Sequence, residues 1–273
     1  FRRHKLAVIS AVILTTLMIL VIFAPLVAPI HPHDIHIESG IYRPPSTDHW
    51  LGTDSVARDV WSRLIYGGRI SITVGVVAIT ISLSIGTIIG GIAGYYGGLL
   101  DSVLMRITDV FLSLPTIIIV LASVALIGPS LRNLILIIGF LSWANIARLV
   151  RGQFLSLREK EYVIAARCIG ANDRRIIIRH LLPNLVGPLT VAATFGVAEA
   201  ILTEAALSYL GLGVQVPTPS WGNMLEAAKQ VSILKFRPWI WIPPGFMIAI
   251  TVLCINIMGD GLRDALDPRA TID

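Results

Sequence analysis

Residues 158–184 read Arg158-Glu-Lys-Glu-Tyr-Val-Ile-Ala-Ala-Arg-Cys-Ile-Gly-Ala-Asn-Asp-Arg-Arg-Ile-Ile-Ile-Arg-His-Leu-Leu-Pro-Asn184. This stretch is a charged interruption in a chain that is otherwise mostly apolar. Its six basic and three acidic side chains are too many for a segment in the hydrocarbon of a bilayer, where each charge is costly. We therefore expect the stretch to lie in water, between membrane spans on either side.

The first part of this stretch has the pattern of a short helix. Tyr162, Ala166 and Ile169 recur at i, i+4 and i+7, which places them on one face of a helix over 161–169. Gly170 follows, and glycine is the residue that the C-terminal end of a helix favours. The helix is therefore predicted to end at this glycine.

A second short helix is predicted after the turn. Asn172 or Asp173 is suited to cap its beginning, and Pro183 is expected to end it. The surrounding arginines would pair with acidic groups of a partner. Small residues that would let another backbone approach closely are Ala165, Ala166 and Gly170. We interpret the stretch as a docking element for another protein.

The composition indicates an integral membrane protein. The 273 residues are 55% hydrophobic and 14% charged, whereas soluble domains carry about 25% charged residues. The net charge of +5 does not require a nucleic-acid partner, because cytoplasmic loops collect Lys and Arg. Cys168 and Cys254 have neither the placement of a disulfide nor the spacing of a metal site. Because the sequence opens on Phe1, we expect further residues before it.

The apolar runs predict six transmembrane helices, over residues 6–30, 70–94, 105–127, 131–150, 185–207 and 238–258. The third is expected to be broken by Pro115. The parts of the chain are then an N-terminal end with helix 1 (1–30), an outer segment (31–69), a five-helix core (70–262) containing the polar loop 152–183 and an outer loop 208–237, and a tail (263–273).

Two local patterns refine this plan. Gly86, Gly90 and Gly94 form a stripe of small residues on the second span, which is suited to close contact with another helix. Residues 54–67 place apolar side chains on one side and charged ones on the other, as in an interfacial amphipathic helix or an ordinary surface helix.

The distribution of basic residues predicts the orientation. With six spans both termini lie on one side, and that side collects 14 of the 22 Lys and Arg, eight of them between Arg148 and Arg179. Positive charge accumulates on the cytoplasmic side. The termini and the docking stretch are therefore expected to be cytoplasmic.

Four blocks of the chain resemble permease subunits of ABC importers, specifically the C-type subunit of the dipeptide/oligopeptide/nickel subfamily. The docking stretch, Glu161-Tyr-Val-x-Ala-Ala-Arg-x-x-Gly170-Ala followed by Ile177-x-x-His180-x-Leu-Pro183-Asn184, looks like the EAA loop of these permeases. The other blocks are residues 51–71, 204–224 and 259–269. Together the blocks cover the chain almost end to end.

This resemblance implies an all-α, type I (MetI-like) permease fold with six transmembrane helices and both termini cytoplasmic, in the inner membrane of a bacterium or archaeon. It also implies a second, homologous permease subunit, two ATPase subunits that use ATP and Mg²⁺, and an extracytoplasmic solute-binding protein. The chain has no Gly-x-x-x-x-Gly-Lys-Ser/Thr phosphate loop. We therefore expect no catalytic residue, cofactor or metal here, and the transported solute to be a di- or oligopeptide, with nickel chelate, glutathione or another small solute as alternatives.

The resemblance assigns ATPase coupling to Glu161, Tyr162, Ala165, Ala166, Arg167, Gly170 and Ala171. Glu199 and Glu204 are candidates for lining the pathway or gating it, because acidic groups inside a span are costly. Hydrogen bonding to neighbouring helices is an equal alternative for them. They differ by about 140° around the helix, so they do not form a carboxylate pair.

Two other residue groups receive less specific interpretations. His31, His33 and His36 lie in a Pro-containing loop without a second ligand cluster, which favours a solvated loop over a metal site. Tryptophans 50, 61, 221, 239 and 241 lie near predicted outer boundaries and are expected to form an interfacial belt. A self-sufficient secondary transporter, a rival class, would show broken helices at matched positions or buried titratable pairs, and neither pattern is evident.

Overall fold

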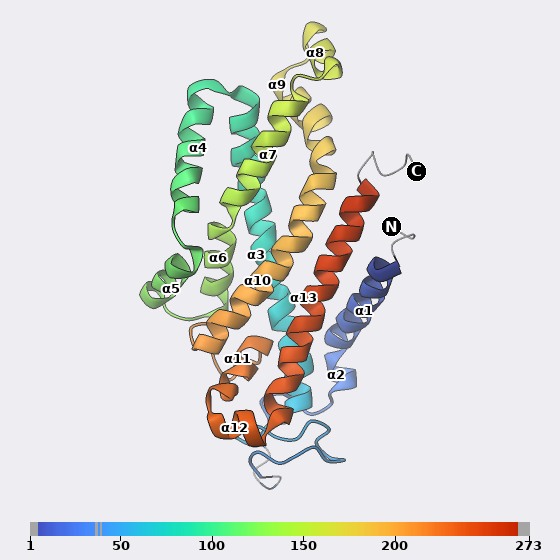
Figure 1. Ribbon diagram of the computed structural model, residues 1–273, viewed down its shortest axis with the longest axis vertical. Coiled ribbons are helices and arrows are strands. Elements are labelled where there is room, and N and C mark those ends of the chain that lie inside the picture. The colour runs from blue at the N-terminus through green and yellow to red at the C-terminus, as the bar shows by residue number, and fades with distance from the viewer. Residues whose placement is uncertain (1–4, 36–37, 39, 267–273) are drawn as a thin grey trace.

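The computed structural model describes residues 5–35, 38 and 40–266. Over these residues the regular structure is helical, apart from an isolated β-bridge between Thr53 and Asp59. The α-helices are α1 (Lys5–Ile22), α2 (Ala24–Val27), α3 (Val60–Tyr96), α4 (Gly98–Ser113), α5 (Thr116–Ile127), α6 (Leu131–Leu141), α7 (Trp143–Leu157), α8 (Glu161–Cys168), α9 (Asp173–Arg175), α10 (Val186–Leu210), α11 (Trp221–Leu225), α12 (Val231–Phe236) and α13 (Pro238–Leu266) (Figure 1).

Five helical segments of the described chain are long and apolar enough to cross a membrane. They are Lys5–Ile22, Val60–Tyr96, Leu131–Leu157, Asp173–Leu210 and Pro238–Leu266. A sixth arises if α4 and α5 count as one span, but these helices are bent by 84° at Pro115. The predicted break at Pro115 is thus confirmed. A proline ends α4 because it offers no N–H for the next helical hydrogen bond.

The glycine stripe of α3 makes the close helix contact that was predicted, and the partner helix is α7. A Cβ atom at Gly86 would lie 2.6 Å from Cβ of Ile146, and one at Gly94 would lie 2.6 Å from Cβ of Phe154. A Cβ atom at Gly90 would overlap the carbonyl oxygen of Ala147. Real Cβ atoms do not approach so closely, so these glycines permit the α3–α7 contact.

The second span begins earlier than predicted, and the separate helix expected over 54–67 is wrong. The Asp59 carboxylate accepts a hydrogen bond from the Ser62 N–H at 2.7 Å and caps α3, which then continues without a break to Tyr96. Residues 54–59 form a loop instead. An N-cap stabilises a helix start by satisfying one of its free N–H groups, so the amphipathic pattern belongs to the outer end of α3.

Pro183 also behaves differently from the prediction. The helical path from Asp173 does not end there but continues through a π-helical turn (Ile176–Leu181) and a 3₁₀ turn (Leu182–Leu185) into α10. Pro183 lies in the first turn of the 3₁₀ segment, where a missing N–H costs little. The predicted second helix is therefore the first part of the fifth span, which runs from Asp173 to Leu210.

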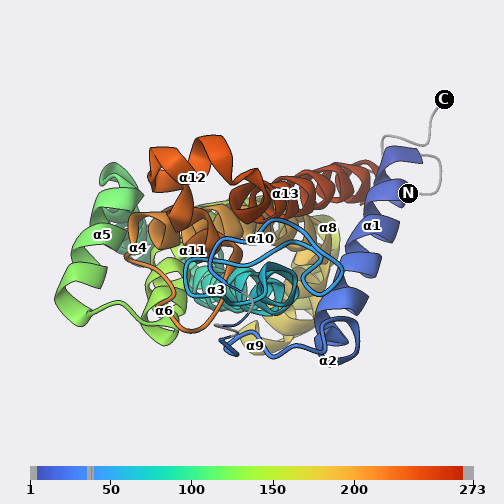
Figure 2. The same ribbon diagram turned by 90° about the horizontal axis from the view of Figure 1, so that it is seen from below.

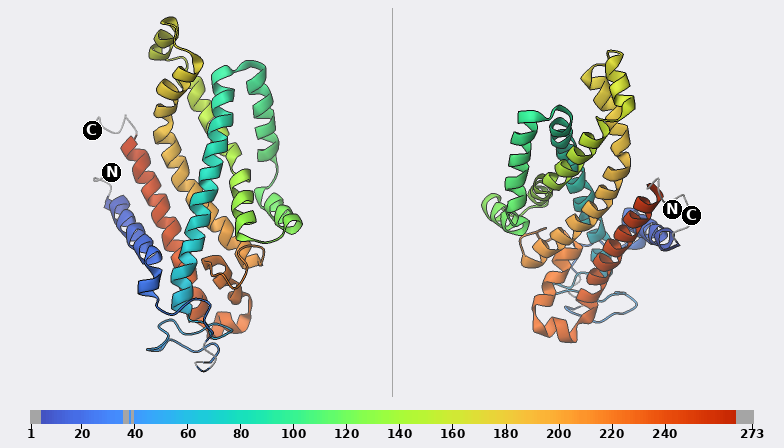
Figure 3. Two further views of the ribbon diagram at one scale, coloured as in Figure 1. Left: turned by 180° about the vertical axis from the view of Figure 1, so that it is seen from behind. Right: turned by 45° about the horizontal axis from the view of Figure 1, so that its top comes forward.

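The two ends of the molecule differ in structure. The hairpin of α8 and α9 extends beyond one end of the helix bundle (Figures 1 and 3). The other end is capped by the outer segments, and residues 40–59 cross this end beneath α3 and α10 (Figure 2). The beginning of α1 and the end of α13 point toward the α8 end (Figure 1).

One tryptophan of the predicted belt lies inside the fold. Trp221 is fully buried, and its Nε1 donates a hydrogen bond to the carbonyl oxygen of Leu64 at 2.9 Å. It packs with Ile201 and Met247 in the core between α3, α10 and α13. The belt assignment is therefore wrong for Trp221, because its indole N–H has a partner inside the protein.

Candidate coupling site and polar cavities

The turn after α8 is a Schellman motif, which is a common helix ending. The N–H of Gly170 donates to the carbonyl of Arg167, and the N–H of Ala171 donates to that of Ala166, both at 3.0 Å. Gly170 has a φ of +84°, a value that side-chain-bearing residues disfavour. The predicted helix end at Gly170 is confirmed, and the following turn is capped as expected by Asn172, whose side chain accepts from the N–H of Arg175 at 2.9 Å.

One face of α8 is buried against the turn that leads into α10. Val163 and Ala166 are buried, and Val163 packs against Ile176 and Leu181. Tyr162 and Ile169, which were predicted to share a face with Ala166, are exposed. The π-helical turn (Ile176–Leu181) supplies the packing partner of α8, and this turn was not predicted from the sequence.

The exposed side of α8 and its turn carries large apolar side chains. Ile169 is 86% exposed, and Tyr162 and Ile164 are about half exposed. The remaining residues assigned to coupling are exposed or partly so, namely Glu161, Ala165, Arg167, Gly170 and Ala171. Apolar side chains gathered beyond the end of a helix bundle typically mark a protein interface.

Polar contacts attach this hairpin to the end of α3. The Tyr95 hydroxyl donates to Asp173 Oδ1 at 2.6 Å, and the guanidinium of Arg167 lies 5.8 Å from the centre of the Tyr95 ring. Arg158 Nη1 donates to the carbonyl of Gly94 at 3.0 Å. Because α9 continues into α10, the hairpin contacts two membrane-spanning segments directly.

Glu204 is a structural hydrogen-bonding residue. Its carboxylate is fully buried and accepts hydrogen bonds from Ser71 at 2.9 Å and from Ser208 at 2.7 Å. Ser71 Oγ also accepts from the N–H of Trp221, and Ser208 Oγ accepts from that of Val214. The network joins α3, α10 and the loop after α10, which is the hydrogen bonding to neighbouring helices that one of the two alternatives for Glu204 describes.

Replacing Glu204 with leucine is expected to destabilise the protein more than replacing it with glutamine. Leucine leaves the Ser71 and Ser208 hydroxyls without an acceptor, and each orphaned buried group costs about 1–3 kcal/mol. Glutamine retains hydrogen-bonding atoms at both positions. Thermal unfolding of the detergent-solubilised protein measures the difference. Equal unfolding temperatures for the two variants would show that the network contributes little to stability. Glu199→Gln, which alters an exposed carboxylate on the same helix, is the matched control.

Glu199 lies on the same helix but in different surroundings. It lines a cavity of about 220 Å³ between α3, α6, α7 and α10, together with Ser142, Asn145 and Thr203. Glu199 and Glu204 therefore lie in different surroundings and do not form a carboxylate pair, as the angle between them around the helix predicted. Asp109 of α4 pairs with Arg148 of α7 at 2.7 Å, and both side chains are exposed.

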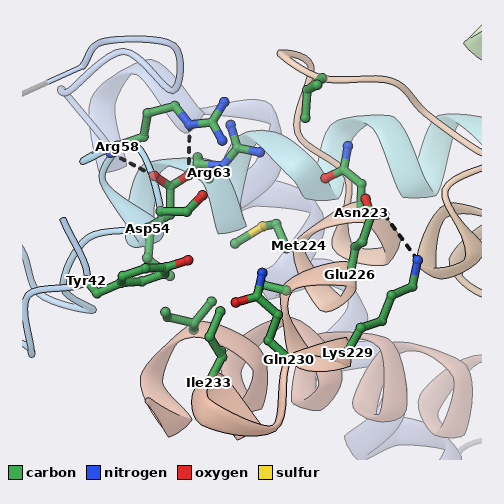
Figure 4. A pocket seen from close by; sticks show the side chains of 15 residues that line it. Tyr42, Asp54, Arg58, Arg63, Asn223, Met224, Glu226, Lys229, Gln230 and Ile233 are labelled. Carbon is green, nitrogen blue, oxygen red and sulfur yellow. Dashed lines mark hydrogen bonds and ion pairs between the residues drawn. The ribbon is translucent and has the colours of Figure 1, made fainter. Parts of the chain in front are cut away.

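A second polar pocket, of about 340 Å³, lies at the capped end (Figure 4). On one wall Asp54 lies between two arginines, with its Oδ2 2.8 Å from Nε of Arg58 and 3.5 Å from Nε of Arg63. On the other wall Lys229 pairs with Glu226 at 3.1 Å. The pocket joins the outer segment that precedes α3 to the loop between α10 and α13.

Comparison with known families matches two models to this chain. Residues 86–272 match the binding-protein-dependent transport system inner membrane component, and residues 1–45 match the N-terminal transmembrane domain of oligopeptide transport permease C. The first match includes α8, its turn and the spans on both sides.

The chain belongs to the binding-protein-dependent permease family of ABC transporters.

Curated relatives of this permease align over nearly its whole length. It is 43% identical to the dipeptide transport system permease protein DppC of Alkalihalophilus pseudofirmus, over 98% of this chain and 87% of that one. It is 41% identical to the oligopeptide transport system permease protein OppC of Bacillus subtilis, over 98% and 87%. The glutathione transport system permease protein GsiD of Escherichia coli is 40% identical, over 98% and 88%.

A solved structure confirms the fold of the permease. The inward-facing MetNI methionine ABC transporter superposes with a TM-score of 0.59 at 20% identity, and the match covers 75% of this chain and 96% of that one. At this identity the likeness concerns the fold alone. The all-α, MetI-like permease fold predicted from the sequence is thereby confirmed.

Two structural features of the permease could not be predicted from its sequence. The Tyr95–Asp173 contact spans 78 residues, and the pocket at the capped end joins segments more than 150 residues apart. No sequence spacing could indicate such pairs. The described residues hold no group of three His, Cys, Asp or Glu placed to bind a metal ion; His31 and His33 lie 5.1 Å apart by ring centroids, and His36 is outside the described residues.

Proposed function

We propose that this permease is one half of the membrane-spanning pathway of an importer for di- and oligopeptides in the inner membrane of a bacterium or archaeon. The 43% and 41% identities to dipeptide and oligopeptide permeases over nearly the whole chain are the observation that carries the proposal. A second, homologous permease subunit supplies the other half. The 40% identity to a glutathione permease makes glutathione, itself a tripeptide, the second candidate solute.

In this proposal α8 docks on one of two ATPase subunits in the cytoplasm. Those subunits bind ATP and Mg²⁺ and perform the hydrolysis, while the permease catalyses no covalent reaction. The exposed Tyr162, Ile164 and Ile169 would enter the ATPase surface. The buried face of α8, through its contacts with the spans, would pass the movement of the ATPase to α3 and α10. A partner shifts the balance between two conformations of a protein only through contacts that differ between those conformations. The excess of Lys and Arg on the α8 side supports its cytoplasmic placement.

At the opposite end a solute-binding protein would deliver the peptide. The capped end, built from residues 40–59, α11 and α12, offers both charged and apolar groups there. A screen of the cognate binding protein against di-, tri- and oligopeptides and glutathione identifies the solute. Preference for glutathione over all other peptides would replace the peptide assignment with the second candidate.

Reconstitution tests the proposal. We expect a tagged copy of this chain to co-purify with two ATPase subunits and a second permease, and the complex in liposomes to import a bound peptide only with ATP and the binding protein. A variant complex with a disabled ATPase site is the control and should import nothing. Peptide uptake by this chain alone, driven by an ion gradient, would instead identify a secondary transporter.

A further inference from the structure

The cavity that contains Glu199 lies among membrane-spanning helices and has a distinctive set of polar groups. Glu199 is the one ionisable residue among those that line it, all of which the structure describes. The polar lining residues are Ser82, Ser142, Asn145, Glu199 and Thr203. An acidic group among spanning helices is costly unless it faces water or a partner. The position of Glu199 at a cavity therefore indicates that it binds a ligand or takes part in transport.

The Glu199 carboxylate has no hydrogen bond or ion pair within the described chain. The hydrogen bond from Thr203 Oγ1, at 2.8 Å, is accepted by the backbone carbonyl of Glu199 and not by its side chain. This distinguishes it from Glu204, whose two oxygens are both occupied. The amide of Asn145 is exposed on the same cavity and has no hydrogen-bond partner among the described residues either.

The neighbouring hydroxyl groups face the cavity as acceptors. Ser142 donates its proton to the carbonyl of Ile138 at 2.9 Å, and Thr203 donates to that of Glu199. The oxygens of these two hydroxyl groups can still accept hydrogen bonds. The side-chain carbonyl of Asn145 and the carboxylate of Glu199 are further acceptors. An ammonium group has three N–H donors and no acceptor, so this lining suits a primary ammonium group and offers no cation to an anion.

The cavity also adjoins a route along α10. A larger cavity of about 690 Å³ shares Leu149, Ala192 and Phe195 with it and extends to Gly187 near the α8 end. From Thr203 to Gly187 the helix rises about 24 Å, at roughly 1.5 Å per residue. The smaller cavity, below the range of about 300–1,000 Å³ typical of whole-ligand pockets, has room for the end of a peptide.

We propose that Glu199 binds the protonated α-amino group of a peptide during its passage through the permease, with Asn145, Ser142 and Thr203 as further acceptors. This inference rests on the proposed peptide import and adds the chemical group that the permease itself recognises. It predicts that the permease contributes selectivity of its own, for peptides with a free amino terminus, beyond that of the binding protein.

The test compares trialanine with N-acetyl-trialanine in liposomes that contain the whole complex. Each peptide is supplied on the binding protein at saturating concentration, so that the preference of the binding protein affects wild type and variants equally. Removing the charge with Glu199→Gln is expected to slow ATP-dependent uptake of trialanine about tenfold, the scale of a lost charge-assisted hydrogen bond. Uptake of the acetylated peptide should change less than twofold.

The matched control is Glu38→Gln, which neutralises an exposed carboxylate in the outer segment and should leave both rates unchanged. Equal slowing of both peptides by Glu199→Gln, or slowing of neither, would overturn the role of Glu199 while peptide import stands. Absence of ATP-dependent uptake of either peptide by the wild-type complex would instead overturn the proposed function, and with it the inference.

Discussion

Replacing Gly90 with leucine is expected to leave little folded permease in the membrane. A side chain at this position would overlap the backbone carbonyl of Ala147 and the Val150 side chain across the α3–α7 contact. Overpacking a well-packed core typically costs about 1–3 kcal/mol, and a clash with backbone cannot be relieved by a rotamer change. The fold would lose the contact between its second and fourth spans. Membrane abundance and thermal unfolding of the solubilised protein measure the loss.

Gly152→Leu is the control for this substitution. Gly152 lies in the middle of α7, and an added Cβ atom there would meet nothing within 4 Å. The same side chain is introduced into a helix of the same protein, so the general effect of leucine is matched. We expect this variant to accumulate as wild type does. If Gly90→Leu accumulates and unfolds as Gly152→Leu does, the close α3–α7 approach does not support the fold.

Replacing Gly170 with valine is expected to uncouple ATP hydrolysis from transport. A β-branched residue at a φ of +84° costs about 1–2 kcal/mol, and the Schellman turn that orients Ile169 would be lost. An added Cβ atom would meet nothing within 4 Å in this chain, so the membrane-spanning fold should persist. Uptake by the reconstituted complex should fall at least about tenfold, while permease abundance in the membrane stays normal.

Gly128→Val provides the matched control for Gly170. Gly128 has a φ of +93° and open space around it, but it ends α5, far from α8. Like Gly170, it has a positive φ that disfavours a side chain, so valine strains the backbone there without touching the coupling site. Reversing the charge with Glu161→Lys should reproduce the Gly170 effect, because Glu161 is exposed in the first turn of α8. Normal transport-coupled ATPase activity in both Gly170→Val and Glu161→Lys would remove α8 from coupling.

Some features could be predicted because they depend on short-range chemistry. The end of α8 at Gly170 and the break at Pro115 follow from backbone properties of glycine and proline. The small-residue stripe predicted a close helix contact for α3, although not that α7 would be its partner. The apolar runs located the spans, because a bilayer sets a minimum length for them.

Other features required the packed structure. The helical path continues through Pro183 by way of the π-helical turn before it. That turn also packs against Val163, a buried side chain of α8. Trp221 looked like a boundary residue, but its burial depends on Leu64, which is 157 residues away. Periodicity within one segment cannot report which surface another segment will cover.

The two glutamates of α10 show what the sequence alone could predict and what it could not. The sequence determined that both lie in a membrane span and face different directions, because helical geometry sets their angular separation. Only the tertiary structure decided that Ser71 and Ser208 surround Glu204, while Glu199 enters a cavity. The physical reason is that the cost of a carboxylate depends on the hydrogen-bond partners and water around it, and those are supplied by helices distant in the chain.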